Sequence, residues 1–429
     1  MRGLLHTTFL AGPLQQADVS FVMEENGRPF LSHQPHMPLI PASNMKLIIS
    51  TAGLLLKDKE VFPPLLTYRQ GAISKGVLNG NLIIDSCGSL IFSARFPVNN
   101  DFEKKNELLS KQITEYAEEL KNAGIREISG DIKLSFERWN AAEENAHYTA
   151  AAAFSYNENT VDTLVKNEEL STVPQKPLVF KFEKNSTIED QDKVKNNLIR
   201  YNAKADSRDY WRISHSPAIK YALSMLKKGL LENGIRIHQK EINSTIQKVK
   251  LFQSESIENV EEFIKPLNKH SDNFRAELMA LLLNRSQRGK AAYTDLNKSI
   301  QSILKEHHLN LKSLNVDDGS GLSRKNRVSA SDLNRLLKYM IKEKSFKSFL
   351  GSMSVAGKSG TLKRRFKGTV WENSFYGKTG TLNGVSALSG YWIRKDKAII
   401  SFSFIGNGAE NELFWDALEK FAASLGFMA

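Results

Sequence analysis

Alternating hydrophobic and polar positions near both ends of the chain predict short β-strands. Residues 19–24 and 28–33 alternate on either side of an Asn-Gly dipeptide, which is typical of a tight hairpin turn. Two further β-rich runs cover 385–394 and 398–405 and are joined by a polar Lys-Asp-Lys linker. Residues 410–425 have the spacing of an amphipathic helix. The two ends therefore look like parts of one layered α/β domain.

The middle of the chain has a different pattern. Residues 77–84 read as strand, glycine and strand, and 106–123 have helical periodicity that ends at a glycine. Two polar stretches, 185–202 and 239–256, lack a period from which elements could be placed. We therefore interpret about 68–256 as an insertion.

Helical periodicity returns after the insertion. It covers 273–283 and 330–342, and a loop rich in aspartate and glycine, 317–321, lies between these two helices. The last part of the chain is thus predicted to contain both helices and strands, as the first part is.

Chain length also favours more than one domain, because single hydrophobic cores stop growing well below 429 residues. We expect a discontinuous domain made of 1–67 and 257–429, with 68–256 inserted into it. Within the insertion we expect two small β-rich or α+β domains, the inner one at about 95–150.

Composition and run lengths exclude several classes of protein. Hydrophobic residues are 41% and charged residues 25%, which is ordinary for a globular protein and excludes wholesale disorder. The longest apolar run, 47–56, is shorter than the roughly 20 residues that a membrane-spanning helix needs. Residues 1–13 make a poor signal peptide because polar residues interrupt them. The single cysteine, Cys87, excludes an internal disulfide and a cysteine-rich metal site.

The net charge is +12, from 59 Lys and Arg against 47 Asp and Glu. A basic excess suits nucleic acid, anionic lipid or an acidic polymer, but charge describes partners and solubility rather than fold. No zinc finger or RNA-binding aromatic motif accompanies it. We therefore expect no nucleic-acid partner.

The first candidate for chemistry is Ser43 with Lys46, at the start of an apolar helix. Residues three apart share a helix face, so the hydroxyl and the amine can form a hydrogen bond. A serine hydroxyl attacks well only when a neighbour takes its proton, and a lysine can do so if burial lowers its pKa. The helix is apolar on nearly every side, which predicts a buried lysine. It begins after Pro41, where backbone N–H groups favour developing negative charge.

The Ser-x-x-Lys spacing also occurs at Ser224 with Lys227 and at Ser302 with Lys305. For any single copy, a pair on a helix surface is the simpler interpretation. The setting at a buried helix start favours Ser43 over the other two serines.

The second candidate is the tripeptide Ser271-Asp272-Asn273, which precedes a predicted helix. Serine, aspartate and asparagine are all favoured helix N-caps, so capping alone accounts for their presence. Whether the tripeptide also takes part in chemistry depends on what lies beside it.

The third candidate is Lys378-Thr379-Gly380-Thr381, which leads into the β-run from residue 385. A lysine and a small glycine on a strand offer a cation and open backbone N–H groups to an anionic substrate. A near copy, Lys358-Ser359-Gly360-Thr361, precedes a charged stretch unlike the edge of a buried sheet. We therefore prefer Lys378 over Lys358.

The three candidates occur in the order Ser-x-x-Lys, Ser-Asp-Asn and Lys-Thr-Gly, a set found in active-serine penicillin-recognising enzymes. The gap between Lys46 and Ser271 is long, whereas most such enzymes place the second motif much sooner, so the gap narrows the choice of family. The chain resembles the class C low-molecular-mass penicillin-binding proteins, the D-alanyl-D-alanine carboxypeptidase/endopeptidase family. Segments similar to that family are 41–47, 318–324 and 356–362.

The resemblance implies a fold of the α/β (α+β) class like that of penicillin-binding proteins and serine β-lactamases. An antiparallel sheet is flanked by helices, with smaller domains inserted between the first and second motifs. It further implies a periplasmic or otherwise extracytoplasmic enzyme that acts on peptidoglycan peptides and is acylated by β-lactam antibiotics. It implies no metal, no cofactor and no transmembrane segment, and leaves peripheral association with the cell envelope open.

The chemistry of the residues and the resemblance together assign five catalytic residues. Ser43 attacks the carbonyl carbon of the D-Ala peptide bond, and Lys46 accepts its proton. Ser271 passes that proton to the leaving amine, and Asn273 holds the substrate amide and orients Lys46. Lys378 supplies positive charge.

The resemblance also suggests residues that bind substrate. Backbone N–H groups of Ser43 and Thr381 form the expected oxyanion hole, and Thr379 bonds the substrate carboxylate together with Lys378. From the basic stretch near the third motif, Arg364 or Arg365 is expected to bind an acidic peptide side chain, and Arg365 is the preferred candidate. The substrate-binding residues are then Thr379, Gly380, Thr381 and Arg365.

Two other functions stay open. A non-catalytic binding protein on the same scaffold suits the basic charge and the segments 86–90 and 133–137, which depart from the family pattern, whereas the five catalytic side chains favour an enzyme. A serine β-lactamase or esterase would turn penicillin over quickly instead of being trapped by it. The sequence does not separate carboxypeptidase from endopeptidase activity.

Overall fold

The structure is a computed structural model that describes residues 14–425, except for 57, 95–100, 140–153, 156–159, 167–168, 174, 176–180, 185–193, 196–197, 202–206, 213–214, 243–245 and 256–258. The spatial contacts between residues divide the chain into two compact units. One unit consists of Met1–Val61 and Glu258–Ala429, and the other of Phe62–Ile257. The stretch 1–13, considered above as a signal peptide, lies outside the described residues.

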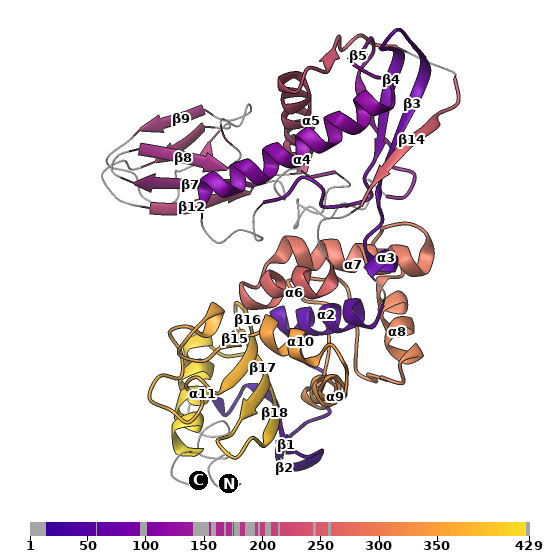
Figure 1. The fold of residues 1–429 in the computed structure, drawn as a ribbon. Coiled ribbons are helices and arrows are strands. Elements are labelled where there is room, and N and C mark those ends of the chain that lie inside the picture. The colour runs from indigo at the N-terminus through magenta and orange to yellow at the C-terminus, as the bar shows by residue number, and fades with distance from the viewer. Residues whose placement is uncertain are drawn as a thin grey trace. The chain divides into compact units, whose positions relative to one another are not determined.

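The first unit is built around a six-stranded antiparallel sheet of order β15-β16-β17-β18-β1-β2 (Figure 1). Its strands are β1 (Asp18–Glu25), β2 (Arg28–His33), β15 (Ser354–Val355), β16 (Phe375–Leu382), β17 (Val385–Ile393) and β18 (Ile399–Asn407). β1 pairs with β18 along its whole length, from Asp18 opposite Asn407 to Glu25 opposite Ile400. Residues from both ends of the chain therefore lie side by side in one sheet.

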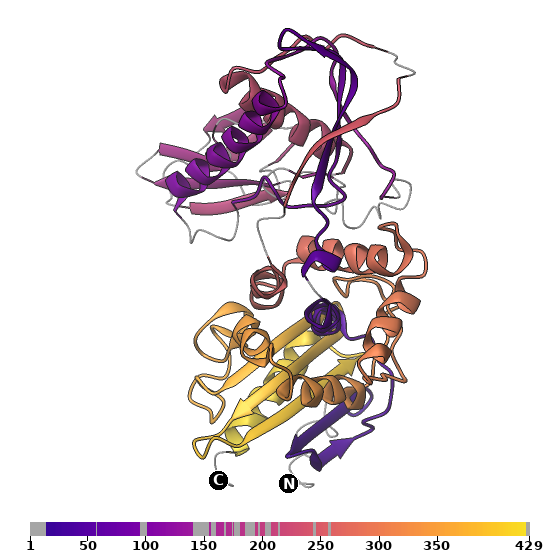
Figure 2. The same ribbon diagram turned by 45° about the vertical axis from the view of Figure 1, so that its right-hand side comes forward.

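Helices cover both faces of this sheet (Figures 1 and 2). The helices of this unit are α2 (Met45–Leu55), α3 (Asp58–Val61), α6 (Val260–Lys269), α7 (Asn273–Arg288), α8 (Leu296–Glu306), α9 (Ala330–Ile341), α10 (Phe346–Ser352) and α11 (Asn411–Leu425). α11 lies on the opposite face from α9, and its Phe421 joins an aromatic cluster that includes Phe21 of β1 and Phe402 of β18. The predicted architecture, an antiparallel sheet flanked by helices, is confirmed.

α2 is the helix that follows the first motif, and it is buried from Met45 to Gly53. It contacts α6, α7, α8 and α9, so apolar side chains are accommodated on almost every side of it. Lys46 lies within this buried segment and is 0% exposed. The predicted burial of this lysine is therefore seen in the structure.

α7 follows the second motif and is longer than the sequence predicted. The Asp272 side chain accepts a hydrogen bond from the Arg275 backbone N–H at 2.9 Å, which caps the first turn. The helix continues to Arg288 and ends at Gly289, whose φ of 81° suits a left-handed C-terminal cap. The prediction stopped at residue 283 because the last turn of the helix is polar.

The second unit contains three sheets and two long helices. One sheet has the order β13-β5-β4-β3-β14, with β6 also paired to β4, and two three-stranded sheets have the orders β12-β7-β8 and β10-β11-β9. The strands are β3 (Leu65–Ser74), β4 (Val77–Asp85), β5 (Glu127–Ile128), β6 (Ile132–Leu134), β7 (Thr160–Lys166), β8 (Glu169–Val173), β9 (Lys181–Lys184), β10 (Val194–Lys195), β11 (Leu198–Tyr201), β12 (Ser207–Arg212), β13 (Arg236–Ile237) and β14 (Val249–Ser254). The helices are α4 (Phe102–Asn122) and α5 (His215–Glu232). β10, β11 and β14 thus lie in the two polar stretches that show no helical or strand period.

The strand–glycine–strand prediction for 77–84 is wrong, because β4 runs through this stretch without a break. Gly80 lies opposite Gly71 of β3 in the antiparallel pair. A Cβ atom on Gly80 would lie 2.0 Å from the Gln70 carbonyl oxygen. Glycine is needed here for the close approach of two strands and not for a turn.

The described part of 95–150 shares a core with the strands around it. Leu109, Ile113 and Tyr116 of α4 belong to the same buried cluster as Leu65 of β3 and Leu82 of β4. The expected inner domain at about 95–150 and the expected boundaries after residues 67 and 256 stay predictions.

Candidate active site

The Lys46 amine joins the first and second predicted motifs. Its Nζ lies 2.9 Å from Ser43 Oγ, 2.8 Å from Asn273 Oδ1 and 2.6 Å from the Ser320 carbonyl oxygen. The last two oxygens can only accept hydrogen bonds. The amine donates to all three oxygens, and the Ser43 hydroxyl donates to the Ser320 carbonyl oxygen at 3.3 Å. Once the amine has lost a proton, Asn273 and Ser320 can bind its two remaining hydrogens, which leaves its lone pair for the Ser43 hydroxyl.

The Lys378 amine joins the second and third motifs. Its Nζ lies 2.9 Å from Ser271 Oγ and 2.7 Å from the Thr379 carbonyl oxygen. Lys378 is 0% exposed on β16. The five predicted catalytic side chains thus form two hydrogen-bonded groups, Ser43–Lys46–Asn273 and Ser271–Lys378. The backbone links these groups, because Ser271 and Asn273 belong to the same tripeptide.

The Ser271-Asp272-Asn273 tripeptide serves as a helix cap and as part of the site at once. Asp272 is the N-cap of α7, whereas the side chains of its two neighbours reach the two amines. Ser271 has a φ of 55°, which is uncommon for a residue with a side chain and is typical of strained functional positions. Capping and chemistry therefore use different residues of the same motif.

Side chains from the sheet hold the turn that carries Ser43. Ser43 lies in the short 3-10 helix η2 (Ala42–Asn44), directly before α2. Asn44 Nδ2 donates to Ser389 Oγ of β17 at 2.8 Å. The Asn407 side chain at the end of β18 accepts from the Ile40 backbone N–H at 3.0 Å and donates to its carbonyl oxygen at 3.1 Å. Sequence reasoning did not identify these contacts because they join residues more than 300 positions apart.

Two glycines allow neighbouring segments to approach this turn. A Cβ atom on Gly380 of β16 would lie 2.7 Å from the Pro41 carbonyl oxygen and 3.1 Å from the Ser43 backbone nitrogen. A Cβ atom on Gly321 would lie 1.9 Å from the Ala42 carbonyl oxygen, and the φ of Gly321 is 86°. A side chain at either position would push its segment away from the nucleophile.

Burial changes the protonation of both amines. It lowers the pKa of Lys46 to about 8, against the opposing effect of the nearby carboxyl groups of Glu277, Asp318 and Asp272. Burial, and then the charge of Lys46, lower the pKa of Lys378 well below its ordinary value. The site can therefore hold a neutral amine beside Ser43 near neutral pH.

The segment that the sequence analysis set aside as a near copy contributes a residue to the third motif. Thr379 Oγ1 donates to Thr361 Oγ1 at 2.8 Å. The Thr361 backbone N–H in turn donates to Ser354 Oγ at 3.0 Å. Lys358, by contrast, is exposed. The sequence could not reveal this, because seventeen residues separate Thr361 from Thr379.

Arg365 does not join the hydrogen-bonded groups around the two amines. Its guanidinium lies 4.3 Å from the centre of the Trp415 ring and 3.3 Å from Glu419 Oε1, both on α11. Its charge is therefore already paired, and the geometry gives no support to the expected contact with a peptide side chain. Thr381, the remaining predicted binding residue, is exposed on β16.

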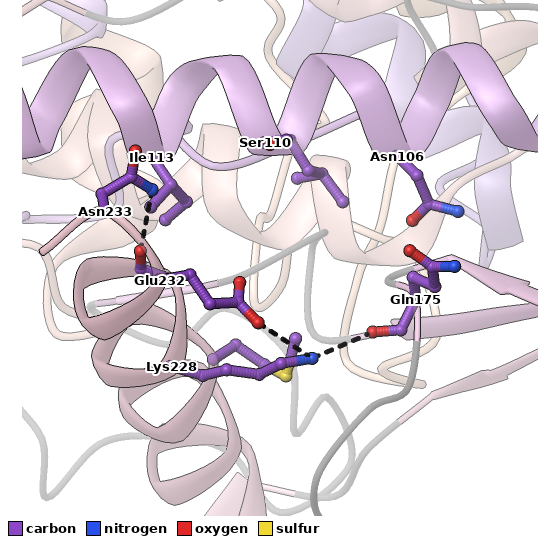
Figure 3. A pocket seen from close by; sticks show the side chains of 10 residues that line it. Asn106, Ser110, Ile113, Gln175, Lys228, Glu232 and Asn233 are labelled. Carbon is purple, nitrogen blue, oxygen red and sulfur yellow. Dashed lines mark hydrogen bonds and ion pairs between the residues drawn. The ribbon is translucent and has the colours of Figure 1, made fainter.

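A cavity of about 140 Å³ lies elsewhere, in the second unit between α4 and α5 (Figure 3). Its lining is mainly polar and includes Asn106, Ser110, Gln175 and Asn233. The Lys228 amine at its wall lies 3.9 Å from Glu232 and 3.5 Å from the Gln175 carbonyl oxygen. None of the predicted site residues lines this cavity, so the candidate site is the one in the first unit.

Comparisons with known proteins agree with this assignment. A family model described as the D-Ala-D-Ala carboxypeptidase 3 (S13) family matches residues 6–424. A D-alanyl-D-alanine carboxypeptidase from Actinomadura sp. strain R39 is 33% identical over 152 residues, which are 34% of this chain and 28% of that protein. The D-alanyl-D-alanine carboxypeptidase DacB from Haemophilus influenzae is 25% identical over 433 residues, which are 93% of this chain and 85% of that protein.

Solved structures give the same fold. The crystal structure of penicillin-binding protein 4 from Haemophilus influenzae is similar with a TM-score of 0.69 and 18% identity, and the match covers 100% of this chain and 98% of that one. This likeness confirms the predicted penicillin-binding fold. The matched range of the family model includes all three motifs. The chain therefore belongs to the D-Ala-D-Ala carboxypeptidase 3 (S13) family, which confirms the predicted resemblance and the predicted class of enzyme.

Proposed function

We propose that this protein is a serine D-Ala-D-Ala carboxypeptidase and endopeptidase that acts on peptidoglycan peptides through an acyl-enzyme. The observation that carries the proposal is the 2.9 Å contact between the buried Lys46 amine and the Ser43 hydroxyl. Two acceptor oxygens hold the other side of that amine, as a general base requires. This geometry favours an enzyme over a binding protein on the same scaffold.

Acylation begins when Ser43 Oγ attacks the carbonyl carbon of the penultimate D-Ala. A bond forms between this oxygen and the carbonyl carbon, and the hydroxyl proton passes to Lys46 Nζ. The carbonyl oxygen becomes an oxyanion that the backbone N–H groups of Ser43 and Thr381 stabilise. The close approach that Gly380 allows supports this arrangement, and losing one such donor typically lowers the rate about 10²- to 10³-fold.

The leaving group needs a proton when the peptide bond breaks. Ser271 is suited to relay it, because its hydroxyl lies 2.9 Å from the Lys378 amine and two residues from Asn273. The Ser271 hydroxyl gives its proton to the leaving nitrogen and takes up the proton that Lys46 accepted from Ser43. The amine of the terminal D-Ala takes this proton and departs. Water then attacks the ester carbonyl carbon of acylated Ser43, which releases the shortened peptide and restores the hydroxyl.

Recognition of a substrate carboxylate is assigned to Lys378 and Thr379. Burial, and then the charge of Lys46, lower the pKa of Lys378. An arriving carboxylate would supply an opposite charge and favour the protonated amine. A carboxylate on a terminal D-Ala, or on a β-lactam, therefore suits this position, which supports acylation by β-lactam antibiotics.

An extracytoplasmic or periplasmic location completes the proposal, because peptidoglycan lies outside the cytoplasmic membrane. Among the described residues, no helix has the length and the apolar composition needed to cross a bilayer. Location is thus proposed from the substrate and from the cell-wall enzymes of the family.

A fluorescent penicillin tests the proposal. We expect the purified protein to form a stable covalent adduct on Ser43, located by mass spectrometry of the labelled peptide. Rapid turnover without an adduct would indicate a β-lactamase, and the absence of both would indicate a binding protein. Mass spectrometry of products from purified cell-wall peptides then separates release of D-Ala from cleavage of cross-links.

A further inference from the structure

A buried glutamate lies one helical turn beyond Asn273. Glu277 of α7 is 0% exposed, and residues four apart on a helix share a face. Its Oε1 accepts from the Ser320 backbone N–H at 2.8 Å, and its Oε2 accepts from the Gly319 N–H at 3.1 Å and from the Tyr293 hydroxyl at 2.8 Å. The carboxyl group thus binds two consecutive backbone N–H groups of the loop after Asp318.

Asp318 holds the other half of the same loop. It is 2% exposed, and its oxygens accept from the backbone N–H groups of Gly321 at 2.8 Å and Ser323 at 2.7 Å, and from Asn326 Nδ2 at 2.7 Å. The Ser320 carbonyl lies between the N–H groups that Glu277 binds and those that Asp318 binds. Its oxygen accepts a hydrogen bond from Lys46 Nζ at 2.6 Å. The position of this acceptor therefore depends on both carboxyl groups.

The two acids also act on Lys46 through their charge. Both carboxyl groups favour the protonated amine and so oppose the effect of its burial on its pKa. Burial, and then the charge of Asp318, raise the pKa of Glu277 itself to about 7. The charge of Glu277 is therefore present in the alkaline range where Lys46 loses its proton.

We propose that Glu277 is a positioning residue for the Ser43–Lys46 pair, because it holds the Gly319–Ser320 backbone against the amine and places a negative charge beside it. The inference rests on the proposed function and extends it to a residue that contacts neither Ser43 nor the Lys46 amine directly. Five titratable groups face this arrangement: Lys46 from α2, Asp318 and Tyr293 from loops, Asp272 from the start of α7, and Lys378 from β16, whose pKa the charge of Lys46 lowers.

The sign of the charge effect follows from these contacts. In the native protein the neutral fraction of Lys46 grows as the pH rises through about 8, so acylation of Ser43 becomes faster there. Removal of the Glu277 charge takes away a group that favours protonated Lys46. The rise in acylation rate then moves to lower pH, by about one pH unit for a nearby charge at the effective dielectric constant of proteins.

The experiment compares a shape-conserving variant with a charge-conserving one. Glu277→Gln keeps the shape of the side chain and removes its charge, whereas Glu277→Asp keeps the charge and shortens the reach to the loop. For each protein, the acylation rate with a fluorescent penicillin is measured by rapid mixing from about pH 6 to about pH 10. We expect Glu277→Gln to lower the midpoint by about one unit. We expect Glu277→Asp to keep the native midpoint and to acylate about ten- to a hundredfold more slowly, as for a misplaced catalytic group.

Asp332→Asn supplies the matched control. Asp332 is a buried carboxyl group of α9 that also holds a loop, since its Oδ2 accepts from the Ser313 backbone N–H at 2.6 Å and from its hydroxyl at 2.7 Å. It has no contact with Lys46 among the described interactions. We expect this variant to lose thermal stability while its acylation midpoint stays at the native value.

The outcomes separate this inference from the proposed function. Native protein that fails to acylate at any pH overturns the proposed function itself. Native protein that acylates, with an unchanged midpoint in Glu277→Gln or an unchanged rate in Glu277→Asp, overturns the role of Glu277 alone. If Glu277→Gln does not fold, judged by circular dichroism, the rate and midpoint of Glu277→Asp decide.

Discussion

The helices α2 and α5 offer the same Ser-x-x-Lys spacing in opposite surroundings. At the start of α2, the amine of Lys46 is buried and contacts Ser43 and two neutral oxygens. On α5, the amine of Lys227 lies 2.6 Å from Asp131, and the Ser224 hydroxyl donates to the Lys220 carbonyl oxygen of its own helix. Spacing brings a serine and a lysine to one helix face, but neutral partners and burial decide whether the amine can serve as a base.

The third Ser-x-x-Lys copy, Ser302 with Lys305, also lacks the surroundings of Ser43. On α8, the Ser302 hydroxyl donates to Glu306 at 3.1 Å, and Lys305 is exposed. A hydroxyl that is bonded to a carboxylate does not face an amine lone pair. Neither Ser224 nor Ser302 is therefore expected to react.

The largest effect is expected for the nucleophile itself. Ser43→Ala removes the hydroxyl that lies 2.9 Å from the buried Lys46 amine, so labelling by fluorescent penicillin should fall to background. Ser224→Ala and Ser302→Ala are the controls and should label like the native protein. Persistent labelling of Ser43→Ala, with normal circular dichroism, would show that another residue is acylated.

A smaller loss is expected when the base is removed. Lys46→Met fills a similar volume and leaves the Ser43 hydroxyl in place, but nothing then takes its proton. We expect acylation to slow by about 10² to 10⁴, the usual contribution of general-base catalysis. Lys227→Met on α5 should leave the rate unchanged, and an equal effect of the two variants would contradict the distinction between the helices.

Asn273→Asp gives Lys46 the kind of partner that Lys227 has. A carboxylate would replace the amide oxygen that now lies 2.8 Å from the amine, and an opposite charge at this distance favours the protonated form. The pKa of Lys46 should rise above its native value of about 8, and acylation at neutral pH should slow about ten- to a hundredfold. The rate should recover as the pH is raised, which rapid-mixing measurements across the alkaline range would detect. A loss that is equal at all pH values would instead indicate misplacement of the substrate.

The smallest effect is expected at Thr361, which supports the third motif and not the base. Thr361→Val keeps the shape and removes the acceptor of the Thr379 hydroxyl, which typically costs about 1 kcal/mol. We expect kcat/KM for a D-Ala-D-Ala peptide to fall about fivefold, mainly through KM, because Thr379 is assigned to the substrate carboxylate. Ser359→Ala is a nearby control and should leave KM unchanged.

The sequence predicted the elements whose pattern is local. The periodicity at 330–342 and 410–425 corresponds to α9 (Ala330–Ile341) and α11 (Asn411–Leu425), and both have one apolar face against the sheet. The Asn-Gly turn likewise separates β1 from β2. Such elements are predictable because their own residues determine them.

Features that depend on distant residues were not predictable in this way. Nothing near Gly80 in the sequence indicates that Gly71 lies opposite it. The sequence pattern therefore predicts two strands where the structure has the single strand β4. The roles of Glu277 and Ser320 were missed because a glutamate in a helix and a serine in a loop are ordinary until their contacts with one another are known. The five catalytic candidates were found because each lies in a recognisable local motif.

The order of the sheet has a consequence for the newly made chain. β18, formed by residues 399–407, lies between β17 and β1 and follows the other described strands along the chain. Until it arrives, β1 has no neighbour on that side, and Ile40 lacks the Asn407 side chain that holds the turn before Ser43. A growing polypeptide that still lacks residues 399–407 therefore lacks the side chain that holds the turn before Ser43.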